Sequence, residues 1–195
     1  MPMTASSSTL DLSGQTIDGR YELLSRLGSG TFGVVYKAID KHFPENDSAH
    51  FCAVKLVSHL GRSPATVRAL RREMTLHKCA SHHPNVIPLH DTFEVPDYSV
   101  FVMDLSPDGD LEDFIVTNGP CTDETTIRTI FLGLLDAVEH MHEEGIYHRD
   151  IKPSNILVDK KTLHVYLTDF GVATRDPRYR ARCGTTSYMP PGMSG

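Results

Sequence analysis

The first half of the chain carries short apolar segments separated by glycine and polar residues. This spacing is typical of β-strands joined by turns, because turns concentrate glycine, proline, asparagine and aspartate. Residues 28–33 contain three glycines and predict the turn of a hairpin, and residues 40–50 predict a polar connection. The predicted strands cover residues 21–27, 34–39, 51–57, 86–94 and 98–105.

A helical periodicity begins at Pro64, a residue suited to the first turn of a helix. Apolar residues then recur at roughly helical spacing up to Leu76, which predicts a helix that stops before residues 83–85. Further along, the pattern predicts a short helix over residues 110–117 and a longer one over residues 124–144, ended by Gly145. Two short strands are predicted over residues 156–158 and 165–167.

The sheet-rich part of the chain precedes the helix-rich part, which is the order of an α+β protein. A turn at Pro107, Asp108 and Gly109 predicts the boundary between a first part, residues 19–105, and a second part, residues 106–195. Residues 1–18 are polar and rich in serine and threonine, so they predict a disordered leader.

Composition narrows the possible partners and compartments. The net charge of −6 argues against a nucleic-acid partner, which needs a basic face. No apolar run approaches the roughly 20 residues of a membrane span, and the N-terminus lacks a signal-peptide core, so we expect no membrane partner. The four scattered cysteines predict neither a disulfide framework nor a zinc site. A reduced compartment follows, and we expect the cytoplasm or the nucleus.

The glycine segment has the form G-x-G-x-x-G-x-V, with Gly28, Gly30, Gly33 and Val35. Glycines allow backbone N–H groups to approach a phosphate closely, where a Cβ would clash. The strand on each side excludes the dinucleotide-binding version of this motif, which needs a following helix. Taken alone, the segment is equally compatible with a hairpin that binds no ligand.

Lys55 stands near the end of the third predicted strand, two residues after Ala53. A lone lysine there is usually a surface residue whose stem packs on apolar neighbours. Glu73 is the only acidic residue between Ser58 and Asn85, and by itself it would be an ordinary partner of an arginine on its own helix.

The most specific chemistry lies in the segment from His148 to Asn155, followed by Asp169, Phe170 and Gly171. Asp150 supplies a carboxylate that can take a hydroxyl proton, and Lys152 supplies an ammonium. Asn155 supplies a carboxamide, and Asp169 supplies a second carboxylate. Phosphoryl transfer from ATP needs these groups, because it depends on positioning and on charge neutralisation.

Together these motifs resemble those of the eukaryotic protein kinases, and the lysine at position 152 resembles the serine/threonine type. Residues 145–150 and 165–174, with Cys183, Gly184 and Thr185, are similar to a fungal group that includes negative regulators of sexual conjugation and meiosis. The resemblance implies a bilobal fold: an antiparallel sheet of five strands with one helix, then an incomplete helical lobe. It implies phosphoryl transfer from ATP, with Mg²⁺, to serine or threonine of a protein substrate.

The resemblance also assigns roles. Lys55 is expected on the α- and β-phosphates with Glu73 as its partner, Asp150 as the acceptor of the hydroxyl proton, and Lys152 on the γ-phosphate. Asn155 and Asp169 are expected to bind Mg²⁺. A core role for Met103 and a helix-cap role for Asp110 remain open alternatives. The expected nucleotide site comprises Gly28, Gly30, Gly33, Val35, Ala53, Lys55, Met103, Asp104, Ser106, Asp110 and Leu157.

Near its end the chain departs from the kinase pattern. Kinases close the activation segment with A-P-E, whereas this sequence has Pro190, Pro191 and Gly192. We therefore expect a second lobe that is cut short after the activation segment. Two functions remain open: an active serine/threonine kinase, or an inactive fragment that binds nucleotide or regulates a partner.

The activation segment itself predicts how the protein is regulated. Residues 172–182 hold four arginines and, as Ser/Thr, only Thr174, while Ala181 stands four residues before Thr185. We expect activation to be independent of phosphate on this loop, with the arginines attracting an acidic substrate or partner segment. Thr185 is expected to hydrogen-bond beside Asp150 and Lys152.

Overall fold

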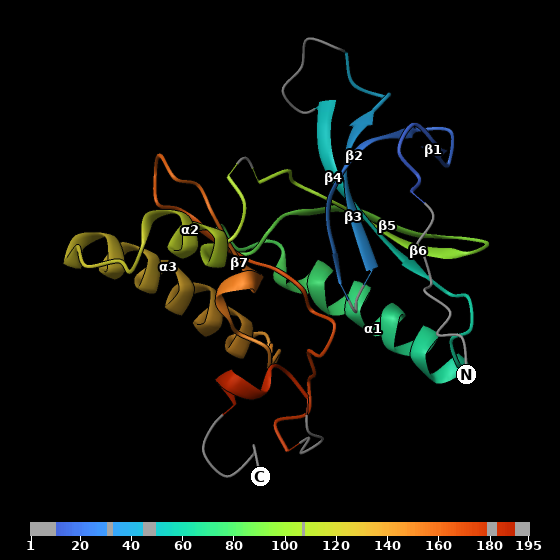
Figure 1. Ribbon diagram of the computed structural model, residues 1–195. Coiled ribbons are helices and arrows are strands. Elements are labelled where there is room, and N and C mark those ends of the chain that lie inside the picture. The colour runs from blue at the N-terminus through green and yellow to red at the C-terminus, as the bar shows by residue number, and fades with distance from the viewer. Residues whose placement is uncertain (1–10, 31–32, 45–49, 107, 179–182, 190–195) are drawn as a thin grey trace, which may run out of the picture.

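The computed structural model describes residues 11–30, 33–44, 50–106, 108–178 and 183–189. A six-stranded sheet with helix α1 beside it forms the first part, and a smaller part is built around helices α2 and α3 (Figure 1). The first part contains β1 (Thr16–Ile17), β2 (Tyr21–Gly30), β3 (Gly33–Asp40), β4 (Phe51–Ser58), α1 (Pro64–Ala80), β5 (Leu89–Val95) and β6 (Tyr98–Met103). The second contains α2 (Leu111–Asn118), α3 (Glu124–Glu143), β7 (Ile156–Val158), β8 (Val165–Leu167) and two 3₁₀ turns, Pro153–Asn155 and Thr186–Tyr188.

The six strands lie in the order β1-β2-β3-β4-β6-β5, and every neighbouring pair is antiparallel. The central strand β4 is buried along most of its length, because both of its faces are covered. Cys52, Val54 and Leu56 point into the core of the sheet, whereas Val57 packs toward α1. Since side chains alternate along a strand, Lys55 is directed to the same side as Val57.

Helix α1 covers that side of the sheet (Figure 1). Ser63 caps its first turn by accepting a hydrogen bond from the Thr66 N–H at 3.2 Å, and Pro64 occupies the first helical position. Leu70 and Met74 recur one helical turn apart and pack against strand residues, among them Phe101.

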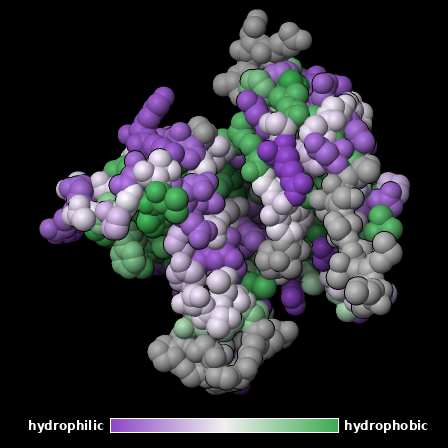
Figure 2. All heavy atoms as spheres, in the orientation of Figure 1, coloured by the Kyte–Doolittle hydropathy of each residue, from purple (hydrophilic) through white to green (hydrophobic). Residues whose placement is uncertain are grey.

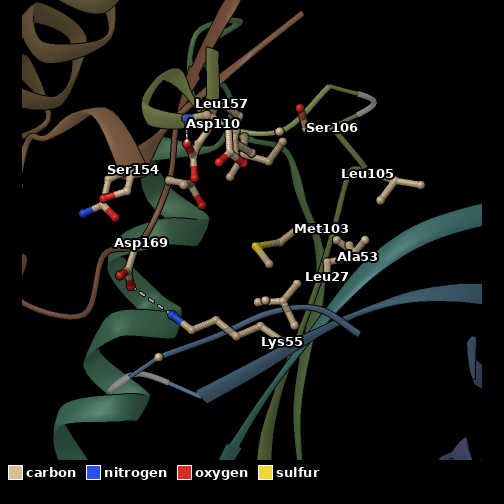
Figure 3. Close-up of a pocket in the computed structure, with 18 of the residues that line it drawn as sticks. Leu27, Ala53, Lys55, Met103, Leu105, Ser106, Asp110, Ser154, Leu157 and Asp169 are labelled. Atoms are coloured by element: carbon tan, nitrogen blue, oxygen red, sulfur yellow. Dashed lines mark hydrogen bonds and ion pairs between the residues drawn. The ribbon is translucent and has the colours of Figure 1, made fainter. Parts of the chain in front are cut away.

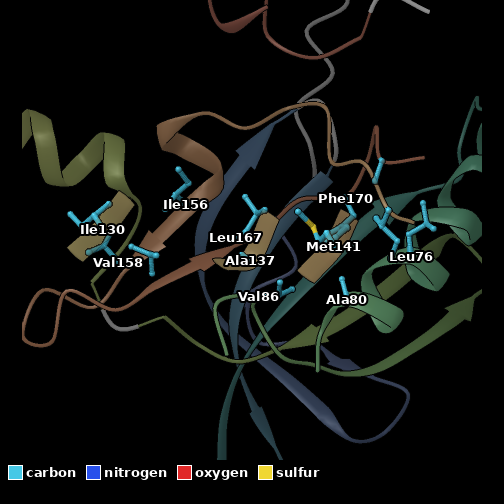
Figure 4. Packing of buried hydrophobic residues seen from close by; sticks show 13 residues of the cluster. Leu76, Ala80, Val86, Ile130, Ala137, Met141, Ile156, Val158, Leu167 and Phe170 are labelled. Atoms are coloured by element: carbon cyan, nitrogen blue, oxygen red, sulfur yellow. The ribbon is translucent and has the colours of Figure 1, made fainter. Parts of the chain in front are cut away.

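The second part has its own apolar core, which α3 shares with β7 and β8 (Figure 4). Met141 and Ala137 of α3 are fully buried there, beside Leu167 and Phe170. The two parts of the chain are joined at the segment before β5. The Ile87 N–H donates to the Leu167 carbonyl at 3.0 Å, and the Leu167 N–H donates to the Asn85 carbonyl at 2.8 Å.

The strand count and several strand ends differ from the sequence prediction; β6, for example, ends at Met103 rather than at residue 105. The sheet has six strands rather than five, because part of the segment predicted to be a disordered leader over 1–18 forms the strand β1. Leu12 holds this segment against the sheet: its side chain is buried, and its N–H donates to the Tyr36 hydroxyl at 3.1 Å. The polar composition of the segment gave no sign of this contact. The strand predicted from residue 86 begins at Leu89, because Val86 pairs instead with Leu167 of β8. Finally, β2 extends through Gly28 and Gly30 rather than ending at residue 27.

Helix α3 presents an apolar face to the surface (Figure 2). Ile127, Phe131, Leu132 and Leu135 are each 46–57% exposed, although Ile130, one position before Phe131, is buried. Among the described residues, no helix is both long enough and apolar enough to cross a membrane.

Gly133 allows α3 to approach the segment that joins the two parts. A Cβ at this position would lie 2.9 Å from Val165 Cγ2 and 3.0 Å from Asn85 Nδ2. Neither atom can retreat easily, since Val165 is buried and Asn85 Nδ2 donates to the Val165 carbonyl at 2.9 Å. Gly133→Ala should therefore lower the free energy of unfolding by about 1–3 kcal/mol, even though alanine is the better helix former. Urea-induced unfolding measures this difference.

The control is Glu139→Ala, an exposed substitution on the same helix, which should change stability by less than about 0.5 kcal/mol. A Gly133→Ala variant as stable as the wild type would show that α3 does not need this close approach.

Candidate active site

A cavity of about 640 Å³ lies between the sheet and the second part (Figure 3). Its wall comes from the β2–β3 hairpin, from β4, from the segment after β6, from β7 and the chain before it, and from the chain after β8. Every residue of the expected nucleotide site lines it: Gly28, Gly30, Gly33, Val35, Ala53, Lys55, Met103, Asp104, Ser106, Asp110 and Leu157.

The Lys55 ammonium lies at the inner end of this cavity, between two carboxylates. Its Nζ is 2.8 Å from Glu73 Oε1 on α1. The same Nζ is 3.0 Å from Asp169 Oδ1 (Figure 3). Burial alone would lower the pKa of Lys55, but the two carboxylates outweigh it and raise the pKa. Burial raises the pKa of Glu73, and the neighbouring ammonium opposes that increase. Lys55 is therefore a buried cation, and the surface alternative for it is wrong.

The structure requires glycine at only one of the three hairpin positions. Gly33 has a φ of +127°, and a Cβ there would clash with the Leu56 carbonyl oxygen. Gly28 and Gly30 have no positive φ, and a Cβ on either would meet no protein atom within 4 Å. At these two positions glycine leaves the wall of the cavity bare, which suits the close approach of a ligand.

Apolar side chains line the opposite end of the cavity. Leu27, Val35 and Ala53 come from the sheet, and Leu157 comes from β7 (Figure 3). Met103 is 7% exposed and belongs to the core that packs α1 on the sheet, so its core role and its place in the cavity wall hold together. A flat apolar ring fits between walls of this kind.

Polar groups border the apolar end. The Asp104 N–H donates to the Pro88 carbonyl at 3.1 Å, and its carboxylate lies 2.5 Å from His90 Nε2. The carboxylate raises the pKa of His90. Asp110 caps α2 by accepting from the Asp113 N–H at 2.8 Å, so the cap role is confirmed while Asp110 also lines the cavity.

Asp150 lies in a dense hydrogen-bonded cluster. Its Oδ1 accepts from the Thr185 N–H at 2.7 Å and from the Thr185 hydroxyl at 2.8 Å, and its Oδ2 is 3.0 Å from Lys152 Nζ. Lys152 also donates to the Thr185 hydroxyl at 2.8 Å, so the predicted place of Thr185 beside Asp150 and Lys152 is confirmed. Burial alone would raise the pKa of Asp150, but the hydrogen bonds from Thr185 and Lys152 lower it. Asp150 is thus a carboxylate at neutral pH.

Asn155 and Asp169 bring oxygen atoms to the same side of the cavity. Asn155 is buried in the turn Pro153–Asn155, and its Nδ2 donates to the Asp150 carbonyl at 2.8 Å and to Asp150 Oδ2 at 3.2 Å. Since the amide nitrogen is committed to Asp150, Oδ1 of Asn155 is the atom available to a cation. Asp169 has a φ of +65°, a left-handed conformation that costs energy in a residue with a Cβ and is held here by its surroundings.

His148 and Phe170, which flank this chemistry in the sequence, are packing residues. His148 Nε2 donates to the Thr168 carbonyl at 2.9 Å, and its ring meets the Phe170 ring edge-on at 5.1 Å. Both side chains are almost completely buried.

Several residues of the cavity wall were not predicted. Leu27 and Ser29 flank the first glycine, Ser154 lies between Lys152 and Asn155, and Thr168 precedes Asp169. Adjacency to a predicted residue was the available signal for these four. Ile87 and Asp113 also line the cavity, and no sequence motif marks Ile87.

Comparison with known proteins identifies the family. Residues 21–193 match the model of the protein kinase domain. The chain belongs to the protein kinase family. The match covers the hairpin, Lys55, Asn155 and Asp169, which line the cavity. It also covers Glu73 and Asp150, which form ion pairs with the lining residues Lys55 and Lys152.

The chain is similar to individual proteins over most of its length. It is 39% identical over 183 residues to the "Negative regulator of sexual conjugation and meiosis" of Schizosaccharomyces pombe, covering 92% of this chain and 38% of that protein. It is 33% identical over 183 residues to the "Serine/threonine-protein kinase cds1" of the same yeast, covering 89% and 38%. It is 34% identical over 181 residues to the "CBL-interacting serine/threonine-protein kinase 1" of Arabidopsis thaliana, covering 89% and 39%. The kinase chain thus spans well under half the length of these relatives.

Acid should destabilise this kinase chain through a buried histidine on α1. Burial lowers the pKa of His77 to about 4, whereas an unfolded histidine titrates near 6.5. As the pH falls from about 6.5 to about 4, His77 becomes protonated in the unfolded chain but stays neutral in the folded chain. The free energy of unfolding should therefore fall by about 3 kcal/mol. In His77→Gln this contribution should be missing, so the variant should lose less stability between pH 7.5 and 4 in urea titrations.

His42→Gln, at an exposed histidine, is the matched control and should retain the wild-type pH dependence. Equal losses of stability in the wild type and in His77→Gln would show that His77 does not titrate in this way.

Proposed function

We propose that this protein is a serine/threonine kinase, which transfers the γ-phosphoryl group of ATP to a serine or threonine hydroxyl of a protein substrate. The observation that carries the proposal is the Lys55 ammonium held between Glu73 and Asp169 at the inner end of the cavity. An ammonium held by two carboxylates beside the glycine hairpin is positioned to meet the phosphates of a nucleotide.

The shape of the cavity supports ATP as the donor. The adenine ring would lie between the apolar walls formed by Ala53 and Leu157, beside Met103. The ribose would lie near Asp110, with Asp104 and Ser106 at the border of the adenine end. The phosphates would then extend under the hairpin, where Gly28 and Gly30 leave the wall bare, toward Lys55.

The oxygen ligands support Mg²⁺ as the cofactor. Mg²⁺ prefers hard oxygen ligands, and Asn155 and Asp169, which both carry such oxygens, line the cavity. When bound, the cation neutralises phosphate charge. The buried amide of Asn155 is held in place by its two hydrogen bonds to Asp150, which ties the cation ligand to the residue proposed as the base.

Asp150 is proposed to orient the acceptor hydroxyl and to take its proton. The lowered pKa keeps Asp150 ionised, as a base must be. The hydroxyl of Thr185 already donates to this carboxylate at 2.8 Å and is an in-chain example of the contact that an acceptor serine or threonine would make. Lys152 Nζ, 2.8 Å from the same hydroxyl, would lie close enough to stabilise negative charge on the transferred group.

The proposal extends to partners and compartment. We propose a protein substrate, no nucleic-acid partner and no membrane partner, in the cytoplasm or the nucleus. The acidic net charge supports this assignment, as do Cys52, Cys79, Cys121 and Cys183, all of which are free thiols in the structure.

Substitution of Asp150 tests the proposed chemistry. Asp150→Asn should lower the transfer rate by about 10²–10⁴-fold. ATP affinity should stay within about threefold of the wild type, because the phosphates are assigned to Lys55, the hairpin and Mg²⁺ rather than to Asp150. Transfer of radiolabelled phosphate to a serine-containing protein and binding of a fluorescent ATP analogue are the two measurements. Lys55→Met should also lower transfer, through misplaced phosphates.

The controls are Asp97→Asn and Lys160→Met, which make the same chemical changes at exposed positions away from the cavity. More than about a tenth of the wild-type rate in Asp150→Asn would contradict its role as the base. Nucleotide binding by the wild type without transfer would support the alternative function, an inactive nucleotide-binding or regulatory fragment. No binding at all would refute both.

Activity should not require phosphate on the loop that follows Asp169. The Arg149 guanidinium already donates to the Val172 carbonyl through Nε, at 2.8 Å, and through Nη2. Thr174 is 5% exposed, and its hydroxyl accepts from the Asp176 N–H at 3.1 Å, so a phosphate there would displace packed structure. Phosphatase treatment of the active enzyme should leave the transfer rate unchanged. Mass spectrometry of residues 172–187 before and after treatment shows whether phosphate was present and removed.

Loss of activity that tracks phosphate on Thr174, Tyr179, Thr185 or Thr186 would overturn this prediction. Of the loop arginines, Arg175 donates to the Glu144 carbonyl at 2.6 Å, while Arg178 is exposed. Arg178 is therefore the described arginine best placed for an acidic substrate or partner segment. Tyr179, Arg180, Ala181 and Arg182 lie outside the described residues.

A further inference from the structure

His90 lies at an irregularity of β5, beside the apolar end of the cavity. In the pairing of β5 with β6, Leu89 lies opposite Met103. The next pair is Asp91 with Val102, so His90 is an extra residue between the two pairs. Such a bulge bends the strand and changes the direction of the side chain that it carries. The side chain of His90 is half exposed, and none of the proposed roles uses it.

The imidazole of His90 contacts the first residue after β6. Its Nε2 lies 2.5 Å from Asp104 Oδ1. Asp104 lines the cavity, as do Met103 and Leu105 on either side of it (Figure 3). The Asp104 N–H donates to the Pro88 carbonyl at 3.1 Å. The backbone and the side chain of Asp104 are therefore both bound to the segment in which β5 begins.

Three carboxylates lie close to His90, in space or along the chain. The hydrogen bond to Asp104 raises the pKa of His90, against a smaller opposing effect of burial, and the charge of Asp40 adds to the increase. Asp40 and Asp91 are both paired with Arg20: its Nη2 is 2.6 Å from Asp40 Oδ2, and its Nη1 is 3.9 Å from Asp91 Oδ2. Asp104 is thus the carboxylate that His90 binds directly.

The charge on the His90–Asp104 pair changes near neutral pH. A histidine ordinarily titrates near 6.5, and here the pKa is raised, so His90 is mostly protonated at about pH 6.5 and loses its proton as the pH rises further. Tyr166 on β8 does not titrate in this range, because burial and the charge of Asp104 raise the pKa of its phenol. Deprotonation of His90 therefore replaces an ion pair with a weaker, neutral contact.

We infer that His90 is a positioning residue for the adenine end of the cavity, and that its ion pair with Asp104 holds the segment after β6 in the place that adenine requires. The inference rests on the proposed binding of ATP, and it adds a residue that acts through Asp104. A ligand that binds only the held segment loses apparent affinity in proportion to the fraction of molecules in which the segment is not held. Nucleotide affinity should therefore fall as the pH rises and His90 becomes neutral.

Adenosine is the probe, because this uncharged nucleoside reports on the adenine end without the phosphates. Calorimetric titration gives its Kd at about pH 6 and at about pH 8.5, on either side of the histidine pKa. His90→Gln keeps a hydrogen-bonding side chain without the charge, whereas His90→Lys keeps the charge at both pH values. The matched control is His82→Gln, the same chemical change at an exposed histidine.

In the wild type, adenosine should bind about two- to fivefold more weakly at the higher pH, which is the range that a half-exposed ion pair can supply. His90→Gln should show the weaker wild-type Kd at both pH values, and His90→Lys should show the tighter one at both. His82→Gln should keep the wild-type pH dependence. Because protonation and binding favour each other equally, saturating adenosine should raise the pKa of His90 measured by NMR.

Equal adenosine Kd values for the wild type at the two pH values would overturn the inference. So would a pH dependence that persists in His90→Gln, because another group would then be its source. If the wild type does not bind adenosine at either pH, the proposed ATP site fails together with the inference. Adenosine binding with the expected pH dependence in a chain that transfers no phosphate would support the inference and the alternative function, a nucleotide-binding fragment.

Discussion

The structure depends on one buried ammonium. Lys55 is enclosed between the sheet and the second part of the chain, and a buried charge is tolerated only when opposite charges meet it at close range. Its two carboxylates come from segments far apart in the sequence, α1 and the chain after β8. The sheet, the helix and the second part must therefore adopt one relative placement for all three charges to be satisfied. The cavity is the space that this placement leaves open.

Around this ion pair, β4 positions side chains, whereas the glycines of the hairpin and of α3 allow close approach. The two-residue periodicity of β4 sends Lys55 toward α1 and the cavity while its neighbours fill the core of the sheet. The hairpin above contributes glycines, and the close packing of Gly133 on Asn85 lets α3 reach the segment that carries Ile87. The segment that carries Ile87 therefore contacts both the second part and α1. Its Ile87 N–H donates to Leu167, and its Ile87 carbonyl accepts from His77 of α1.

The Asp150 cluster is organised on a different principle. Here four groups from a short stretch of chain and from Thr185 satisfy one carboxylate, and their hydrogen bonds keep it ionised in spite of partial burial. The ion pair at Lys55 fixes how the parts sit together, whereas this cluster holds an ionised carboxylate within one part. The shared residue is Asn155, which holds Asp150 and offers an oxygen to the cavity.

The amino-acid sequence by itself determined the elements and the chemistry. Apolar periodicity predicted the helices α1, α2 and α3 to within about two residues. The motifs predicted Lys55, Asn155 and Asp169, which line the cavity, and Asp150, which accepts a hydrogen bond from Asn155. These signals are local: a strand alternates, a helix repeats every 3.6 residues, and catalytic groups keep fixed distances along one loop.

Only the tertiary structure decided the features that depend on contacts between distant segments. The segment that forms β1 is held by the burial of Leu12 and its hydrogen bond to Tyr36. The strand β5 begins after residue 86, where it was predicted to begin, because Val86 pairs with Leu167. The places of Ile87 and His77 have the same origin, since a hydrogen bond from a helix to a backbone carbonyl leaves no pattern in the sequence. Composition and spacing record what each segment can do, whereas long-range packing selects which of those possibilities the folded chain uses.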